Sequence, residues 1–482
     1  MNPVESILTL MEQPVSAEDK ARIERAYHFA ADAHRDQKRK SGEPYVTHVV
    51  AAAKNCALLG MDIETIVGAL LHDVLEDTAI APQEIKTAFG ENVLFLVEGV
   101  TKLGRVKYRG EVRHVESMRK FFIAMAEDIR VLIIKLADRL HNVETLEHVP
   151  EEKRKRIALE TIEVHASLAG RLGMGKLKGI LEDHAFKYAY PKEYERTTAI
   201  FKERAPLAKQ AVNNAHTAVE KTLTEYKIEA AVESRIKHTY SLYRKLVKYE
   251  WNVEKVYDII ALRVLVASVA DCYQVLGLIH MLWKPIPGRI KDYIALPKHN
   301  SYQSLHTTVI TESGIIEIQI RTHEMHEVAE MGIAAHFMYK EKTTTTAPLD
   351  WLDEIKELHG IIKNPSTFLK HLHLDLFRNR IFVFTPKGDV IDLPEGAVPI
   401  DFAYLIHSAL GEKTSAAKIN GKLVALHTKL KNGDVVEIIT GKNAKPSGKW
   451  LDFAKTTAAR KKIRAYIAEH GSFIDRFFSR NQ

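Results

Sequence analysis

The sequence predicts a multidomain α + α/β protein with a helical N-terminal third, a mixed-sheet α/β middle and a small β-rich unit towards the C-terminus. In the N-terminal third, apolar residues such as Ile66, Ala69 and Leu70 recur at the spacing of a helix. In the middle, isoleucines alternate with polar residues as in a strand. The chain has 482 residues, 46% hydrophobic and 27% charged, which is an ordinary globular composition. This length predicts about three domains.

One constellation in the helical third consists of two imidazoles and two carboxylates, residue types that bind transition metals. They are His48, His72, Asp73 and Asp138. Mixed imidazole and carboxylate ligands suit Mn²⁺, Fe²⁺ or Zn²⁺, and the residues alone do not choose between them. A single buried His-Asp pair is more often a hydrogen-bonded core contact. If residues 66–77 form one helix, Asp73 and Asp77 share a face as like charges, which costs roughly a few tenths of a kcal/mol and indicates a cation nearby.

The middle of the chain contains two dense polar strings, at 288–293 and 298–306, followed by a strand-like segment at 315–321. In a strand, Glu317, Gln319 and Arg321 project from one face, while the intervening isoleucines enter the core. Taken alone, this pattern also fits an amphipathic strand with a solvated face. A second apolar run contains Asp258. Two carboxylates on buried strands among basic residues suit a Mg²⁺ ion that bridges substrate phosphates.

Two connections separate these parts. Residues 190–232 form a charged helical stretch, and residues 340–348 form a polar linker that ends in proline. Beyond a short helical piece, the apolar runs 381–384 and 390–393 flank a turn sequence, which indicates a hairpin. The predicted domains are 1–190, helical; 191–340, α/β with the helical connector leading; 341–378, linker and short helix; 379–441, β-rich; and 442–482, a basic helical tail.

Charge is concentrated at the C-terminal end. Residues 441–482 carry ten Lys or Arg against three acidic residues, a net of +7 that equals the formal charge of the whole chain. A basic helix beside a small β unit suggests contact with tRNA or the ribosome. An amphipathic helix docked through Ile463, Tyr466 and Ile467, with its charges in solvent, explains the pattern equally well.

The composition excludes two other classes of protein. The two cysteines, Cys56 and Cys272, are far apart in the sequence, so neither a disulfide framework nor a thiolate metal site is expected, and a reducing cytosol is indicated. Residues 1–20 lack a basic-then-apolar signal pattern, and no apolar run reaches the roughly 18 residues that a membrane helix needs. We expect a cytoplasmic protein with no membrane contact.

Several long motifs occur in an order that identifies a family. They are residues 39–45, 72–78 and 135–142 in the N-terminal third, and residues 235–245, 257–258, 289–306 and 317–322 in the middle. Together they resemble RelA/SpoT homologues, which make and degrade the alarmone (p)ppGpp. Residues 379–441 resemble a TGS domain. The resemblance implies an all-α HD phosphohydrolase domain, a mixed-sheet α/β nucleotidyltransferase-like synthetase domain and a β-grasp TGS domain.

For the synthetase, the resemblance implies transfer of pyrophosphate from ATP to the 3′-hydroxyl of GDP or GTP, with Mg²⁺ held by Asp258 and Glu317. Glu317 would be a metal ligand or the base that activates the 3′-hydroxyl. The ATP side would contain Arg235, Lys237, Ser241 and Lys245, and the guanine nucleotide side Lys298, Asn300, Tyr302 and His306, with Tyr302 as the stacking ring. Lys291 lies in an Arg-x-Lys-Asp sequence that implies GDP as the preferred acceptor. Ser301 stands where the family usually has glycine, and a side chain there would be able to shift the loop that carries Tyr302.

For the hydrolase, the resemblance implies Mn²⁺ held by His48, His72, Asp73 and Asp138. The metal would lower the pKa of a bound water, so that a nucleophile forms at neutral pH. Glu76 and Asp77 would contact that water. The alarmone would be contacted by Arg39, Lys40 and Ser41 at the guanine, and by Asn142 and Thr145 at the ribose or phosphates. Because each of these positions carries the expected residue type, we expect an active hydrolase that releases GDP or GTP and pyrophosphate.

The prediction is therefore a bifunctional alarmone synthetase and hydrolase, in a short form without the C-terminal zinc-finger and ACT-type domains of longer members. Two alternatives stay open. One is a predominantly hydrolytic enzyme with a weak synthetase, as Ser301 would allow. The other is an RNA- or ribosome-binding regulator with vestigial catalysis.

Overall fold

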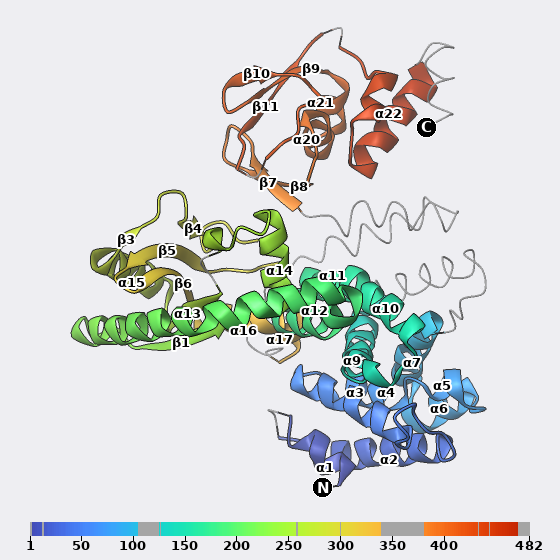
Figure 1. Cartoon of the computed structure of the whole chain (residues 1–482). Coiled ribbons are helices and arrows are strands. Elements are labelled where there is room, and N and C mark those ends of the chain that lie inside the picture. Colours follow the sequence, from blue (N-terminus) through green and yellow to red (C-terminus); the bar gives the residue numbers. More distant parts are fainter. Residues whose placement is uncertain are drawn as a thin grey trace. The chain divides into compact units, whose positions relative to one another are not determined.

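The structure is a computed structural model that describes residues 2–11, 14–104, 125, 127–256, 259–298, 300–338, 380–431, 433–442 and 444–470. The chain divides into two compact units (Figure 1). Within the described residues, one comprises the residues up to 338 and the other comprises residues 380–470. Asp258 and the predicted linker and short helix at 341–378 lie outside the described residues.

The N-terminal part of the first unit is helical, which confirms the predicted all-α domain. Its helices are α1 (Pro3–Leu8), α2 (Ala17–Ala33), α3 (Val46–Leu58), α4 (Ile63–Leu71), α5 (Val74–Asp77), α6 (Pro82–Phe89), α7 (Glu91–Gly104), α9 (Arg130–Glu144), α10 (Glu151–Glu160), α11 (Ala166–Arg171) and α12 (Gly175–Ala189). A 3₁₀ turn lies at Leu146–His148, and a π-helical turn at Thr161–His165 joins α10 to α11. Helices α3, α4 and α9 pack together, and their apolar faces are buried.

Residues 66–77 do not form the single helix on which the expected pairing of Asp73 with Asp77 depended. Helix α4 ends at Leu71 and α5 begins at Val74, with His72 and Asp73 between them. Successive side chains of a regular helix do not face each other. The imidazole Nε2 of His72 nevertheless lies 3.2 Å from Oδ2 of Asp73, and the break in the helix allows both to point the same way.

The second half of this unit is built on a six-stranded mixed sheet, as predicted. Its elements are α13 (Pro191–Glu225), β1 (Ala230–Ile236), α14 (Thr239–Lys248), a 3₁₀ turn (Val253–Lys255), β2 (Ile260–Val266), α15 (Val269–Leu282), β3 (Lys284–Pro285), β4 (Lys291–Asp292), β5 (Leu305–Thr311), β6 (Gly314–Thr322), α16 (His323–Met331) and α17 (Ile333–Met338). The strand order is β1-β2-β6-β5-β3, with β4 paired to β5. Strands β2 and β6 are parallel, and the other pairs are antiparallel.

The two faces of β6 differ as the alternation predicts. Ile316, Ile318 and Ile320 are at most 1% exposed, in a core to which α13 and α15 contribute. On the other face Arg321 is also 1% exposed, and its Nη2 lies 3.2 Å from the Glu330 carboxylate of α16. At Arg321 the polar face is therefore covered by α16 rather than solvated.

The charged connector is part of the mixed-sheet domain. It consists of α13, whose apolar residues between Ala211 and Leu223 belong to the same core as the sheet. Its last residues, from Ala230, already form β1. One side of the helix is charged and the other is buried. Because charged and other polar residues dominate its composition, the composition alone resembles that of a linker.

The second unit is a small β structure with helices. It contains β7 (Arg380–Phe384), β8 (Val390–Pro394), α20 (Pro399–Ile406), α21 (Ser408–Glu412), β9 (Thr414–Ile419), β10 (Lys422–Val424), β11 (Val436–Thr440), a 3₁₀ turn (Gly448–Asp452) and α22 (Thr457–His470). Strands β7 and β8 form the predicted hairpin, and β10-β9-β11 form an antiparallel sheet.

The basic helix α22 is docked onto this unit. Ile463 and Ile467 are buried against Tyr404 and Trp450. The buried Asp401 carboxylate accepts hydrogen bonds from the backbone N–H groups that precede the helix. The interpretation of an amphipathic helix with a docked apolar face is thus confirmed for this part of the tail. Among the described residues, no helix combines the length and the apolar character that crossing a membrane requires.

Candidate metal centre and nucleotide pocket

Four side chains from three elements converge in the helical domain. His48 comes from α3, Asp138 from α9, and His72 and Asp73 from the break between α4 and α5. The Nε2 atom of His48 lies 3.2 Å from Oδ1 of Asp138 and 3.4 Å from Oδ2 of Asp73. The Nε2 atom of His72 lies 3.2 Å from Asp73 and 3.8 Å from Asp138. The four predicted ligands are therefore brought together.

The donor atoms fit a bound cation. His48, His72 and Asp138 are buried and offer ligand atoms within 4.8 Å of one another. The Nδ1 atom of His72 lies 2.8 Å from the carbonyl oxygen of Ala69, so this nitrogen must carry the proton. Its Nε2 faces the carboxylates of Asp73 and Asp138 and is the nitrogen left for a metal, and this buried atom has no hydrogen-bond partner. A backbone contact that fixes the tautomer in this way is typical of metal-bound histidine.

Neighbouring groups keep both carboxylates ionised. Burial by itself would raise the pKa of Asp138, but the Lys135 ammonium at 2.7 Å and the two histidines hold that pKa well below its usual range. Burial would also raise the pKa of Asp73, and His72 and His48 outweigh it. The Asn142 amide donates to Oδ1 of Asp138 at 2.5 Å. The site therefore presents negative charge to a cation.

The hydroxyl of Tyr45 lies beside both Asp73 and Asp77, the two like charges for which a nearby cation was expected. This hydroxyl lies 2.8 Å from Oδ2 of Asp73 and 3.0 Å from Oδ2 of Asp77, so a hydrogen-bond donor sits where a cation was expected. Beside this pair, burial raises the pKa of Glu76 to about 7. A carboxyl group with this pKa exchanges protons readily near neutral pH.

Some of the predicted alarmone contacts lie together at the edge of this site. The Arg39 guanidinium donates to Oδ1 of Asn142 at 3.1 Å and to Oγ1 of Thr145 at 3.2 Å. Lys40 is exposed, and the Ser41 hydroxyl donates to Glu43 at 3.4 Å. The sequence analysis missed the neighbouring groups Lys135, Tyr45 and His141. All three lie in or beside the matched motifs, but only the fold shows what they touch.

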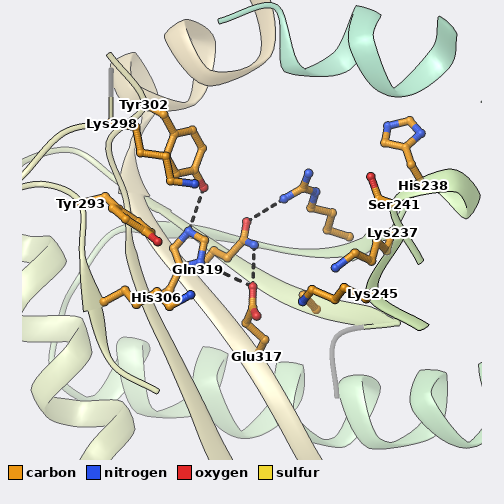
Figure 2. A pocket seen from close by; sticks show the side chains of 13 residues that line it. Lys237, His238, Ser241, Lys245, Tyr293, Lys298, Tyr302, His306, Glu317 and Gln319 are labelled. Atoms are coloured by element: carbon orange, nitrogen blue, oxygen red, sulfur yellow. Dashed lines mark hydrogen bonds and ion pairs between the residues drawn. The ribbon is translucent and has the colours of Figure 1, made fainter. Parts of the chain in front are cut away.

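The polar face of the mixed sheet forms the floor of a pocket of about 310 Å³. The lining residues are Arg235, Lys237, His238, Ser241, Lys245, Ala261, Lys291, Tyr293, Lys298, Tyr302, His306, Glu317 and Gln319. Figure 2 shows Lys237, His238, Ser241 and Lys245 on one side of this pocket, and Tyr293, Lys298 and Tyr302 on the other. Five of the lining residues are Lys or Arg and one is acidic, which suits a polyanion such as a nucleotide phosphate chain.

A chain of hydrogen bonds runs along the pocket floor. Arg235 donates to Gln319 at 3.1 Å, and Gln319 donates to Glu317 at 3.0 Å. The Nδ1 atom of His306 lies 3.5 Å from Glu317, and its Nε2 lies 2.8 Å from the Tyr302 hydroxyl. Burial would raise the pKa of Glu317, but the bonds from His306 and Gln319 and the charge of Lys245 hold it far below its usual value. Glu317 is therefore an ionised carboxylate in a basic pocket.

The opposite side of the pocket is aromatic. The Lys298 ammonium lies 4.4 Å from the centre of the Tyr293 ring and 4.6 Å from that of Tyr302. Burial, and then repulsion from Lys291, lowers the pKa of Lys298 to about 8. Flat rings beside a cation are suited to a base with an attached phosphate.

The pocket contains all four residues predicted for the ATP side and three of the four predicted for the guanine side. It also contains Lys291. Asn300 is not among its lining residues, and its side-chain amide donates to the Gly170 carbonyl at 3.2 Å. The sequence analysis missed His238, Tyr293 and Gln319 as pocket residues, although all three lie in the quoted motifs. Gln319 was detectable, because it shares a strand face with Glu317.

The backbone of Ser301 adopts a conformation that glycine favours. Its φ is +59°, in the left-handed region. The surrounding turn is closed by a hydrogen bond from the Ser301 N–H to the Lys298 carbonyl at 2.8 Å, and by one from the Lys298 N–H to the Tyr302 carbonyl at 3.0 Å. The serine therefore adopts the conformation expected of glycine, at a cost in backbone energy.

Three family models match the chain. They describe an HD domain at residues 26–175, a region found in RelA / SpoT proteins at residues 234–344, and a TGS domain at residues 381–440. The three matches fall, in that order, on the helical domain, the mixed sheet and the small β unit.

Curated relatives match over nearly the whole chain. A guanosine-3′,5′-bis(diphosphate) 3′-pyrophosphohydrolase from Aquifex aeolicus is 50% identical over 95% of this chain and 66% of the relative. A GTP pyrophosphokinase from Streptomyces coelicolor is 47% identical over 93% of this chain and 55% of the relative. The bifunctional (p)ppGpp synthase/hydrolase SpoT from Escherichia coli is 43% identical over 96% of this chain and 67% of the relative.

The chain thus spans between about half and two-thirds of the length of these relatives. The similarity extends through both candidate sites and through the small β unit, so it concerns the arrangement of the domains as well as single motifs. On this evidence the chain belongs to the RelA/SpoT family.

Proposed function

We propose that this chain is a bifunctional alarmone enzyme, which makes (p)ppGpp from ATP and GDP or GTP and hydrolyses (p)ppGpp to GDP or GTP and pyrophosphate. The observation that carries the proposal is the presence of two separate and chemically different sites in one chain. One is a buried His/Asp cluster, and the other is a basic pocket with an ionised Glu317. Relatives that resemble this chain over more than nine-tenths of its length are named for both activities.

In synthesis, the 3′-oxygen of GDP or GTP forms a bond to the β-phosphorus of ATP, and AMP leaves. Glu317 accepts the proton of the 3′-hydroxyl or helps to hold Mg²⁺ together with Asp258. The metal, when bound, would neutralise charge on the transferred group. Arg235, Lys237, Ser241 and Lys245 hold the ATP phosphates.

The guanine nucleotide takes the opposite side of this pocket. Tyr302 stacks on the base, while Lys298, Lys291 and His306 neutralise or hydrogen-bond its phosphates and ribose. Asn300 is part of this proposal only if its amide leaves the Gly170 carbonyl, where it donates in the structure. The 3′-hydroxyl of the guanine nucleotide then meets the β-phosphate of ATP over the carboxylate of Glu317.

In hydrolysis, water adds to phosphorus and the bond to the ribose 3′-oxygen breaks, which releases pyrophosphate. His48, His72, Asp73 and Asp138 would hold Mn²⁺, which when bound supplies an acidified water. Glu76 takes the proton of that water, for which a pKa of about 7 suits it. Asp77 orients the water, and Arg39, Lys40, Ser41, Asn142 and Thr145 contact the alarmone.

For the second unit we propose contact with tRNA or the ribosome. Three lysines before α22 are exposed, namely Lys442, Lys445 and Lys449, and so is Lys461 within it. Such a group attracts a phosphate backbone. A cytoplasmic location belongs to the same proposal, and both cysteines are free thiols, as is usual in a reducing compartment.

The test is direct. The protein is incubated with ATP, GDP and Mg²⁺ in one tube and with ppGpp and Mn²⁺ in another, and the nucleotides are separated by chromatography. We expect AMP and ppGpp in the first tube and GDP and pyrophosphate in the second. Conversion in the second tube alone would favour the predominantly hydrolytic alternative, and conversion in neither would favour the RNA-binding regulator.

A further inference from the structure

We propose that Asp183 of α12 is a positioning residue for the ATP side of the pocket, and that Gly179 of the same helix provides the space this requires. The inference rests on the proposed function and assigns a role to residues outside the region 234–344 that carries the synthetase match. It concerns how α14, which presents His238, Ser241 and Lys245 to the pocket, is held in place.

The N-terminus of α14 is capped by another helix. The first N–H groups of a helix have no partner within it, and the N-cap side chain usually supplies one. The N-cap here is His238, which makes no such bond. Instead the backbone N–H of Tyr240 donates to Oδ1 of Asp183 at 2.9 Å. A carboxylate also suits the positive end of the helix dipole.

The same carboxylate holds the side chain of His238. Its Oδ2 lies 2.8 Å from Nδ1 of that ring. Because a carboxylate accepts, Nδ1 carries the proton. Asp183 thus fixes both the first turn of α14 and the ring that precedes it.

Gly179 provides the space for this ring. It lies four residues before Asp183, on the same face of α12. A Cβ atom at Gly179 would lie 2.2 Å from Nε2 of His238 and 2.3 Å from its Cδ2, so any side chain at this position would displace the ring. Glycine is unfavourable inside a helix, and close approach of another group is a sufficient reason for it here.

The consequence concerns one side of the pocket. His238, Ser241 and Lys245 are spaced so that they share a face of α14. Figure 2 shows them on the same side of the pocket, opposite Tyr293 and Tyr302. Asp183 is not a lining residue, so it acts through α14 and not on the nucleotide. Loss of its contacts is therefore expected to weaken ATP binding and to leave binding of the guanine nucleotide unchanged.

The test uses two variants with matched controls. Asp183→Ala is compared with Glu195→Ala, which removes an exposed carboxylate from the neighbouring helix α13. Gly179→Ala is compared with Gly277→Ala inside α15, where an added Cβ meets nothing within 4 Å. For each we measure KM for ATP, KM for GDP, the affinity for a non-hydrolysable ATP analogue by calorimetry, and ppGpp hydrolysis.

We expect Asp183→Ala and Gly179→Ala to raise KM for ATP and the Kd of the analogue about tenfold, the size of a lost helix cap, with KM for GDP and hydrolysis within about twofold of wild type. Asp183→Asn keeps an acceptor for Tyr240 and is expected to recover part of the loss. In a His238→Ala background, Gly179→Ala should have no further effect, because the ring it displaces is absent.

Three results would overturn the inference. They are an Asp183→Ala protein that matches Glu195→Ala, equal changes in the two KM values, and a Gly179→Ala effect that persists without the His238 ring. If the wild type made no ppGpp, the proposed function would fail, whereas the analogue affinities would still decide the role of Asp183. The Gly179 variants test the same contact if Asp183→Ala does not fold.

Discussion

The ion pair beneath the metal cluster offers a quantitative test of how the helical domain is held together. Lys135 and Asp138 lie one turn apart on α9, with Nζ and Oδ2 2.7 Å apart and side chains 11% and 5% exposed. Burial would lower the pKa of Lys135, but the Asp138 carboxylate outweighs it and raises that pKa. The folded protein thus contains a buried ammonium that depends on one carboxylate. We perturb this pair with Asp138→Asn, and with the double variant Lys135→Met/Asp138→Asn.

Removing one partner of a buried ion pair costs about 3–5 kcal/mol, because the other charge stays buried without its counter-charge. Asparagine keeps a neutral oxygen near the ammonium, so we expect the lower end of this range, about 3 kcal/mol. The double variant leaves no buried charge in the pair, and we expect its stability to return to within about 1 kcal/mol of wild type.

The assay is amide hydrogen exchange, followed by mass spectrometry with a chelator present so that metal binding does not contribute. A loss of about 3 kcal/mol predicts exchange roughly a hundredfold faster in peptides from α9 and α3, which pack together. Peptides from α22 belong to the other compact unit and should be unchanged. The reasoning is refuted if Asp138→Asn exchanges within about threefold of wild type, or if the double variant exchanges as fast as the single one.

Four further predictions concern the two activities. Glu317→Gln keeps the shape but removes the charge at the pocket floor, so synthesis should fall by at least about a hundredfold while ppGpp hydrolysis stays at the wild-type rate; AMP release near the wild-type rate would exclude Glu317 as base or metal ligand. Asp73→Ala should abolish ppGpp breakdown and Mn²⁺ binding measured by calorimetry but spare AMP release from ATP, and continued hydrolysis would place the metal elsewhere. With equal GDP and GTP, the Arg-x-Lys-Asp sequence around Lys291 predicts mostly ppGpp, and chromatography that shows mainly pppGpp would contradict it. Ser301→Gly removes a left-handed serine that costs about 1 kcal/mol, so KM for GDP and the melting temperature should be unchanged or improved, whereas a higher KM for GDP would mean that the serine contributes a contact.

The His/Asp cluster shows how much could be predicted from the sequence motifs. His48, His72, Asp73 and Asp138 are 90 positions apart at the extremes, yet the structure places their ligand atoms 3.2 to 3.8 Å from one another. They were identified because their positions match the HD motifs of the family that the sequence resembles. The break at His72 and Asp73 was not detectable, since helical periodicity continues on both sides of it.

In the nucleotide pocket, too, some features could be predicted from the sequence and others could not. Alternation along β6 predicted which side chains share a face, because a strand repeats every two residues. It did not predict that Asn300 donates to Gly170, more than a hundred positions earlier, or that Tyr45 bridges Asp73 and Asp77. These bonds join elements whose meeting depends on packing.

The sequence by itself determined the order of the domains, the chemical types gathered in each site and the family to which the chain belongs, because motifs and periodicity are local properties. The tertiary structure alone decided that α13 is part of a core and not a linker, and that Asp183 and Gly179 support a helix that begins more than fifty positions later. The physical reason is that a local pattern specifies which face of an element must be buried, whereas the partner that buries it is selected by the packing of the whole unit.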